Sequence, residues 1–227
     1  MNEKEDSTIC PNCGEKLKSG WSVNSLIPLT QTNFINEFLD KTSKGYCDKC
    51  SPTLKEDAAQ KFDLEKNSLT TFFRNNISAI PILTTHTPFG WEYEPISIVT
   101  GQSVTGTGLF SEIASSATDF FGAQSGIFNS KLAAGEKLCF SQLRWKALEL
   151  NAEAIIATDI DYGEVGAIKG MLMVCCAGTA IKLNNKTVLG ENYKIIEELL
   201  NKKDRLVKLG STENPFYSEM FGTRKQL

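Results

Sequence analysis

The chain has 227 residues, enough for one or two domains with a packed core, and 41% of them are hydrophobic, as in ordinary globular proteins. Its 24 Lys and Arg oppose 27 Asp and Glu for a net charge of -3, which excludes the basic excess of a nucleic-acid surface and the acidic block of a solvating tail. Seven cysteines, an odd number, favour metal ligands or free thiols over a disulfide framework.

The N-terminal segment, MNEKEDSTIC, is charged and lacks the apolar region of a signal peptide. The longest apolar run, 171–177, is strand-sized and falls far short of the ~18 residues of a membrane span. Free thiols without an export signal indicate a reducing compartment. We therefore expect a cytoplasmic protein with no membrane span and no nucleic-acid partner.

Residues 1–52 contain the motif Cys-x-x-Cys twice, at Cys10 and Cys13 and again at Cys47 and Cys50. Each motif puts two thiols on a tight turn, and two such turns can close a tetrahedral shell of four thiolates around Zn²⁺. The 33 residues between the motifs exceed the ~15–20 of a usual ribbon, and a helix expected over 31–43 fills the insertion. Because four thiolates leave no open position for water, the site is expected to be structural rather than catalytic.

Two alternatives would use the same cysteines. They could be unrelated redox or free pairs, but a thioredoxin-like role needs Cys-x-x-Cys beside a βαβ unit, which the sequence does not predict. An iron–sulfur cluster or another soft metal would accept the same four ligands. We expect Zn²⁺ as the cofactor of a zinc-ribbon-like module, and a protein partner for that module.

After this module the charged sequence over 51–73 predicts a helix, and residues 53–79 are interpreted as a helical connector. Beyond Ile80 the chain is rich in Thr, Ile, Val and aromatic residues and broken by Pro and Gly, which is typical of strands and turns. The further elements expected are strands over 82–86 and 94–105, a helical region over 110–151 interrupted at FGAQSG, strands over 154–162 and 170–183, and a helix over 191–208. The tail is expected to be loose, with Phe216, Tyr217 and Phe221 as candidate anchors.

The stretch IIATDIDY carries two carboxylates on an expected strand. Residues two apart on a strand point to the same face, roughly 7 Å apart, so Asp159 and Asp161 share one face. By the same alternation, Ile156, Ile160 and Tyr162 take the other face. A catalytic pair would need further catalytic or substrate-binding residues. The sequence shows no nucleophile motif, and GQSVTGTG at 101–108 matches no phosphate-binding loop.

Two other interpretations of this pair stay open. With Glu164, the two acids could hold a hard cation through oxygen, and the single histidine, His86, could join them only through the fold. Alternatively, the carboxylates accept hydrogen bonds at a structural or subunit junction, with Tyr162 as a polar neighbour. We favour the structural or interface role over a ligand site, and a ligand site over catalysis.

The other three cysteines lie in predicted core elements. Cys139 falls on the apolar stripe of the helical region, and Cys175 and Cys176 are adjacent in a strand, so they face opposite sides. Buried free cysteine behaves as a small hydrophobe. We therefore interpret all three as packing residues rather than as a soft-metal or redox site.

Several motifs between Ile82 and Leu183 carry a family resemblance: ILTTHTPFGWEYEPISIVTGQSVTG, GAQSGIF, NAEAIIATDIDYGEVG and GMLMVCCAGTAIKL. This segment resembles the YbjQ-like family, which is named for heavy-metal binding and has no established activity. The resemblance implies an α+β fold with a small antiparallel sheet and packed helices, related to the dodecin type, that assembles into pentameric rings. The expected organisation is a zinc-ribbon-like module of four cysteines at 1–52, a connector at 53–79, a YbjQ-like domain at 80–186 and a C-terminal helix and tail at 187–227.

The strand MLMVCCAGTAI is apolar on both faces. One face carries Met173, Cys175 and Ala177, and the other carries Val174 and Cys176. A strand with one face in water would alternate apolar and polar residues, so both faces are expected to be covered. A neighbouring copy of the chain is the expected cover of the second face, in agreement with the pentamer that the resemblance implies.

The sequence thus predicts a non-enzymatic, homo-oligomeric metal-binding adaptor with a structural zinc site. The alternative is a heavy-metal-handling protein whose YbjQ-like domain itself binds metal or a small ligand near Asp159 and Asp161. An enzyme that uses this acid pair is the third hypothesis.

Overall fold

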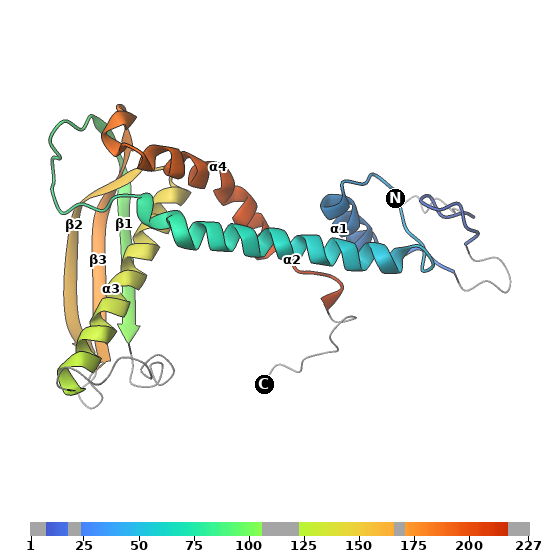
Figure 1. Ribbon diagram of the computed structural model, residues 1–227, viewed down its shortest axis with the longest axis horizontal. Helices are drawn as coiled ribbons and strands as arrows, with labels where there is room; N and C mark the ends of the chain where they lie inside the picture. Colours follow the sequence, from blue (N-terminus) through green and yellow to red (C-terminus); the bar gives the residue numbers. More distant parts are fainter. Residues whose placement is uncertain (1–7, 18–23, 106–122, 166–170, 218–227) are drawn as a thin grey trace, which may run out of the picture. The chain divides into compact units, whose positions relative to one another are not determined.

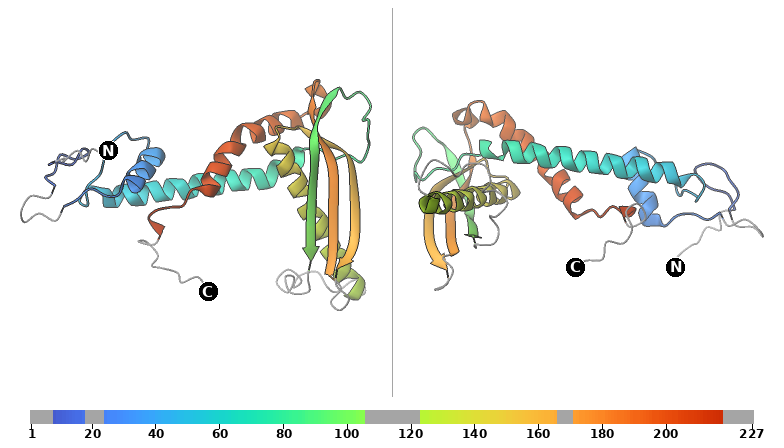
Figure 2. Two further views of the ribbon diagram at one scale, coloured as in Figure 1. Left: turned by 180° about the vertical axis from the view of Figure 1, so that it is seen from behind. Right: turned by 60° about the horizontal axis from the view of Figure 1, so that its bottom comes forward.

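The computed structural model describes residues 8–17, 24–105, 123–165 and 171–217. The chain divides into two compact units: unit 1 comprises Met1–Thr71 and Asp204–Leu227, and unit 2 comprises Phe72–Lys203. Figures 1 and 2 trace the elements of both units. In the described part of the chain, no helix has the length and apolar character needed to cross a membrane.

Unit 2 contains a three-stranded antiparallel sheet in the order β1-β3-β2, formed by β1 (Tyr93–Thr105), β2 (Ala154–Val165) and β3 (Met171–Leu183). Helix α3 (Ala123–Glu149) lies across one face of this sheet, as Figure 2 shows. The predicted α+β fold class, with a small antiparallel sheet and packed helices, is confirmed.

The core of unit 2 lies between α3 and the sheet. Alternate residues of β3 enter it, as the period of two along a strand requires. The buried residues of this cluster are Val99, Cys139, Leu143, Ala147, Ala152, Ile155, Val174, Cys176 and Ala180. Of the apolar stripe predicted for the helix, Cys139, Leu143 and Ala147 face the sheet, whereas Leu138 and Leu150 are exposed.

A β-bulge interrupts β2 directly before the acid pair. Ile156 pairs with Thr179 and Asp159 pairs with Ala177, so two residues of β2 stand against one of β3, and Ala157 has a φ of 52°. Because of the extra residue, Ile156 lies on the same face as Asp159. The prediction that Ile156 faces the opposite side was therefore wrong.

The two outer strands, β1 and β2, have hydrogen-bond partners for some of the backbone groups on the edge that faces away from β3. Gln142 of α3 accepts from Gln102 N at 2.9 Å and donates to Gln102 O at 3.0 Å, and Lys146 donates to Thr100 O at 2.6 Å. Residues 81–85 exchange backbone hydrogen bonds with 155–158 of β2. This contact contains a single bridge, Ile82 with Ile155, so the strand predicted over 82–86 does not form as such.

The remaining predicted helices are present, with shifted ends. They are α1 (Leu29–Leu39), α2 (Ser51–Asn76) and α4 (Asn192–Ser211), and two short 3-10 turns occur at Ile77–Ala79 and Lys186–Leu189. Helix α1 ends earlier than predicted because Asp40 adopts the left-handed conformation that terminates helices. Of the helical region predicted over 110–151, α3 begins at Ala123, and residues 106–122 lie outside the described part.

Unit 1 has an aromatic core to which distant segments contribute. Phe34 and Phe38 of α1 pack against Phe62 of α2, and Phe216 packs against Phe34. The other buried members are Ile27, Ile35, Tyr46, Ala58, Ala59 and Leu209. The module around the paired cysteines thus shares its core with residues beyond position 52. Of the three anchors considered for the tail, Phe216 is buried, Tyr217 is half-exposed, and Phe221 lies outside the described residues.

Candidate metal centre

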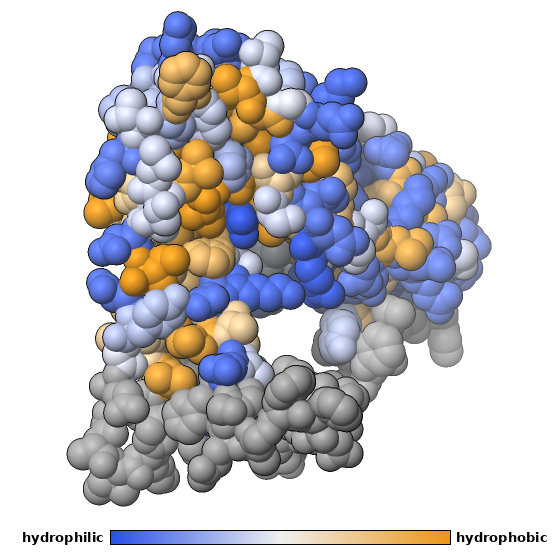
Figure 3. Space-filling model, turned by 60° about the vertical axis from the view of Figure 1, so that its left-hand side comes forward, coloured by the Kyte–Doolittle hydropathy of each residue, from blue (hydrophilic) through white to orange (hydrophobic). Residues whose placement is uncertain are grey.

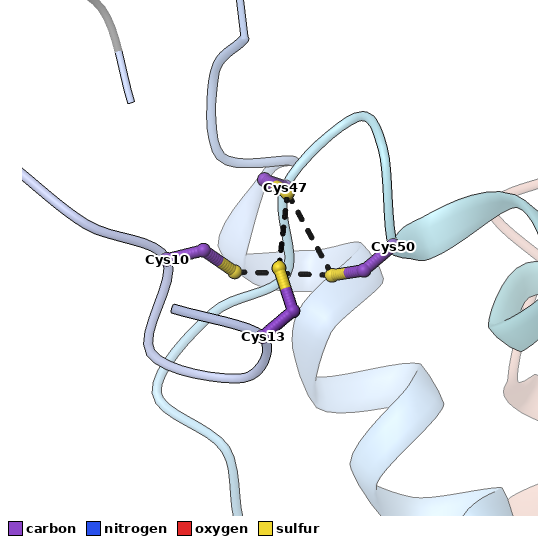
Figure 4. Close-up of side chains that lie close together, drawn as sticks. All are labelled: Cys10, Cys13, Cys47 and Cys50. Carbon is purple, nitrogen blue, oxygen red and sulfur yellow. Dashed lines mark hydrogen bonds between the residues drawn. The ribbon is translucent and has the colours of Figure 1, made fainter. Parts of the chain in front are cut away.

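The four paired cysteines converge in unit 1, and we call Cys10, Cys13, Cys47 and Cys50 the four-cysteine centre (Figure 4). All four Sγ atoms lie within 4.8 Å of one another. The Sγ separations are 3.8 Å for Cys10–Cys50, 3.6 Å for Cys13–Cys47 and 3.8 Å for Cys47–Cys50. A tetrahedron with metal–sulfur bonds of about 2.3 Å has edges of about 3.8 Å. The thiols therefore stand at the corners that a tetrahedral ion requires.

Two tight turns position these thiols. In the first, Gly14 N donates to Cys10 O at 2.9 Å, and Gly14 has a φ of 74°, a left-handed conformation that glycine adopts without strain. In the second, Ser51 N donates to Cys47 O at 2.9 Å, and the chain passes from Cys50 directly into α2. Cys50 consequently lies directly before a helix N-terminus, and burial raises the pKa of its thiol despite hydrogen bonds that lower it.

Neighbouring side chains support the thiols. Asn12 donates to Cys50 Sγ at 3.5 Å, and Asn24 hydrogen-bonds to Cys47. Lys49 and Glu15 form an ion pair at 2.8 Å that links the two turns. Such outer contacts orient ligands and tune their basicity. Sequence reasoning missed both asparagines, although Asn12 stands inside the first Cys-x-x-Cys motif.

The thiols of the four-cysteine centre differ in acidity. Burial raises the pKa of Cys47, but hydrogen bonds from the amides of Cys50 and Lys49 and from Asn24 outweigh it and lower this pKa to about 6. The amide of Glu15 lowers the pKa of Cys13, whereas burial and the three neighbouring thiols raise it to about 12. A thiolate at one cysteine therefore disfavours ionisation of the neighbouring thiols. A bound cation would remove this repulsion.

The chemistry of this donor set fits a closed site. Cys10 and Cys47 are buried, whereas Cys13 is exposed at the surface. Four sulfur ligands complete a tetrahedron and leave no position for a substrate or a water. The centre is therefore suited to hold a metal ion for structure and not for turnover.

The acid pair lies elsewhere, on the face of the sheet that α3 does not cover. Asp159 pairs with Ala177 and Asp161 with Cys175, and both carboxylates are exposed. Asp159 Oδ1 accepts from the backbone N–H of Ile160 at 3.0 Å. The prediction that the two acids share a face is confirmed by this register.

Among the residues that the structure describes, no group of three candidate metal ligands includes the acid pair. Tyr162 pairs with Val174 on the helix-covered face, and its hydroxyl donates to Glu136 at 2.9 Å. Tyr162 is thus separated from the acids by the sheet, as its alternation predicts. Glu164 pairs with Leu172 in the ladder, and its side chain lies outside the described residues. His86 is exposed and accepts from Tyr93 through its backbone oxygen.

The three further cysteines divide between the two faces of the sheet. Cys139 and Cys176 are buried between α3 and β3, whereas Cys175 is half-buried on the other face. The alternation of Cys175 and Cys176 is as predicted. Sequence alone did not bring Cys139 next to Cys176, because that contact depends on how the helix crosses the sheet.

The family comparison concerns unit 2. Residues 80–184 match the YbjQ family, which is described as "Putative heavy-metal-binding". A solved structure from Pediococcus pentosaceus, a protein of unknown function of the DUF74 family, is similar with a TM-score of 0.33 and 19% identity, over 47% of this chain and 100% of that one. The match to the heavy-metal-binding family does not include the four-cysteine centre, which precedes it in the chain.

Proposed function

We propose that the four-cysteine centre holds one structural Zn²⁺ per chain. The single observation that carries this proposal is the convergence of the four Sγ atoms: three of their six separations are 3.6 to 3.8 Å, close to the edge of a zinc–thiolate tetrahedron, and all lie within 4.8 Å. Thiolate ligands also accept iron and other soft ions, but a mononuclear tetrahedral site closed by two Cys-x-x-Cys turns is the usual geometry of structural zinc.

Elemental analysis of the purified full chain tests the zinc proposal. We expect one zinc per chain in the wild type and none in Cys47→Ser, because three thiolates and a hydroxyl no longer close the shell. Cys175→Ser is the matched control, since it removes a half-buried thiol from the other unit. Zinc retained in full by Cys47→Ser, or iron in its place in the wild type, would contradict the assignment.

We further propose that unit 2 binds other copies of the same chain through the sheet face that α3 does not cover. Ile98 is 70% exposed and Val104 is 52% exposed on this face, and both stand beside half-buried residues of β3, among them Met173 and Ala177. Figure 3 shows hydrophobic side chains in several groups among polar ones on the side that it turns forward. Burial of such apolar area contributes about 25 cal/mol per Å².

Some backbone groups at the sheet edges already have hydrogen-bond partners within the chain, so another copy is expected to bind the sheet face instead. Side chains of α3 already use the backbone groups of Thr100 and Gln102 on β1, so edge-to-edge pairing at that point is blocked. The pentameric ring implied by the family resemblance is the assembly we propose. A ring would present several zinc modules at once and strengthen weak contacts with a protein partner, the role of a non-enzymatic cytoplasmic adaptor.

Light scattering on the zinc-loaded full chain tests the assembly. We expect a single species of about five chains, and we expect Val104→Asp to reduce its mass because a charge on the buried face costs desolvation. Val207→Asp is a matched control on α4, since Val207 is 51% exposed and lies in unit 1. A wild-type monomer at micromolar concentration would contradict self-association.

A second candidate function is metal handling by unit 2 itself. The supporting observation is the family description, which concerns residues 80–184 and not the four-cysteine centre. Asp159 and Asp161 are two exposed carboxylates on one face of β2 that could bind a hard cation. Equilibrium dialysis against Mn²⁺ should then show weaker binding in Asp159→Asn/Asp161→Asn, and unchanged binding would exclude this pair as the site.

A further inference from the structure

Two thiols meet in the core of unit 2, where α3 crosses the central strand. Cys139 has 0% exposed surface and Cys176 has 3%. Both belong to the core cluster between α3 and the sheet, and Cys139 Sγ donates at 3.1 Å to the backbone oxygen of Val174, two residues before Cys176 on the same face of β3. A dithiol therefore lies in an apolar environment, with one sulfur from the helix and the other from the sheet.

The backbone around this pair permits a close approach of helix and sheet. Gly101 of β1 pairs with Cys176, and a Cβ on Gly101 would lie 2.5 Å from Cys139 O. The helix can pass this near because position 101 has no side chain. Both sulfurs are thus held by regular elements, which fix a site better than loops do.

The pair offers two sulfur donors and no third. Within the described ranges of the chain, the four-cysteine centre is the one group of three or more candidate ligands. An ion that needs four ligands, such as Zn²⁺, therefore finds no complete shell at Cys139 and Cys176. A soft ion that accepts two thiolates needs no further donor.

The charge of the ion matters as much as its softness. Burial raises the pKa of Cys139, and burial together with the Cys139 thiol raises the pKa of Cys176 to about 12. A lone thiolate is accordingly disfavoured in this core. A divalent ion that replaces both thiol protons forms a neutral bis-thiolate, whereas a monovalent ion would leave one buried negative charge.

We propose that Cys139 and Cys176 form a second metal site, which takes a soft divalent ion in two-coordinate geometry, with Hg²⁺ as its representative. Binding forms two sulfur–metal bonds and releases two weak ligands of the ion, chloride or water. The two thiol protons pass to solvent, and no electron is transferred. This site is independent of the zinc proposed for the four-cysteine centre.

The test uses the zinc-loaded full chain, treated with excess HgCl₂ and then with excess glutathione before desalting and mercury analysis. Glutathione removes mercury from single thiols more readily than from a preorganised pair, whose second sulfur binds at high effective concentration. We expect Cys139→Ser and Cys176→Ala each to retain one mercury per chain fewer than the wild type. Cys175→Ser, which removes the neighbouring thiol on the other face, should retain the wild-type amount.

Equal retention by all three variants would overturn the proposal, and so would an equal loss in Cys175→Ser. Circular dichroism checks that each variant is folded. A second measurement needs no variant: an anomalous difference map of the mercury-treated wild-type crystal should place one ion between Cys139 Sγ and Cys176 Sγ. Mercury elsewhere in unit 2 alone, or a Cys139–Cys176 disulfide in its place, would contradict the site.

Discussion

Phe216, near the end of the described chain, packs edge-on against Phe34 of helix α1, with ring centroids 5.4 Å apart. The two residues are separated by most of the sequence, yet both belong to the core of unit 1. The segment that carries the four-cysteine centre is therefore completed by the C-terminal segment.

Phe216→Ala should destabilise unit 1 by about 3–5 kcal/mol, because it removes a fully buried aromatic ring from a packed cluster. Chemical denaturation of the zinc-loaded chain measures the loss, and zinc transfer to a chelator should become faster. Tyr217→Ala is the control, since half of that side chain is exposed. Equal effects of the two substitutions would show that Phe216 is not an anchor.

The acid dependence of unit 1 follows from a charged cluster on its surface. Arg205 donates to both oxygens of Glu65 at 2.7 Å and to Glu37 at 2.6 Å. Hydrogen bonds from Arg205 lower the pKa of Glu65, and those from Lys208 and Arg205 lower the pKa of Glu37. A lowered carboxylate pKa contributes stability that is present above the unfolded value of about 4.3 and is lost as the pH falls through the folded value.

Carbon-13 NMR titration of the side-chain carboxyls tests this cluster. Glu37 and Glu65 should both titrate below about 4.3, and Arg205→Gln should raise the midpoint of Glu65 toward that value. The difference in unfolding free energy between wild type and Glu65→Gln should be constant from about pH 5 to about pH 8. In this range Glu37 and Glu65 are ionised in both the folded and the unfolded chain. A difference that changes within that window would contradict the assigned direction.

Lys203 closes the C-terminal end of α3. This residue is buried, and its Nζ donates to Leu148 O at 2.8 Å and to Asn151 Oδ1 at 2.8 Å. Lys203→Met keeps the length of the side chain but removes its hydrogen bonds to both oxygens, and Leu148 O then keeps only the backbone N–H of Asn151 as a donor. We therefore expect unit 2 to lose about 1–3 kcal/mol. Lys194→Met, at an exposed position of α4, should change the melting temperature little. A stable Lys203→Met variant would show that water replaces the ammonium group.

Gly101→Ala should separate α3 from β1, because the added Cβ would meet the carbonyl of Cys139 at 2.5 Å. Backbone cannot move as a side chain can, so we expect a lowered melting temperature and weaker protection of α3 amides from hydrogen exchange. Gly210→Ala in α4 has no neighbour within 4 Å and should be neutral or stabilising by up to about 1 kcal/mol. Equal behaviour of the two alanine variants would contradict the close approach.

Much of the fold could be predicted because its signals are local. Helical spacing and runs of β-favouring residues located α2, α4 and all three strands, and alternation along β2 placed Asp159 with Asp161. The bulge at Ala157 could not be seen, since a bulge depends on which residues of β3 stand opposite. It moved Ile156 to the other face and left the rest of the pattern unchanged.

The four-cysteine centre was predictable for a similar reason: Cys-x-x-Cys spacing fixes each half of the site within one turn. The supporting Asn24 has no such local signal, since it reaches Cys47 only through the fold. The Cys139–Cys176 contact likewise depends on the helix crossing and on Gly101. Sequence patterns thus identified the four clustered cysteines and missed the side chains that surround them.

The measurement that tests the central claim most directly is zinc K-edge X-ray absorption on the purified full chain. We expect four sulfur neighbours at about 2.3 Å and no nitrogen or oxygen ligand, since Cys10, Cys13, Cys47 and Cys50 close the shell. A first shell with fewer sulfur atoms and added oxygen or nitrogen, or a protein without zinc whose four thiols remain free, would contradict this claim.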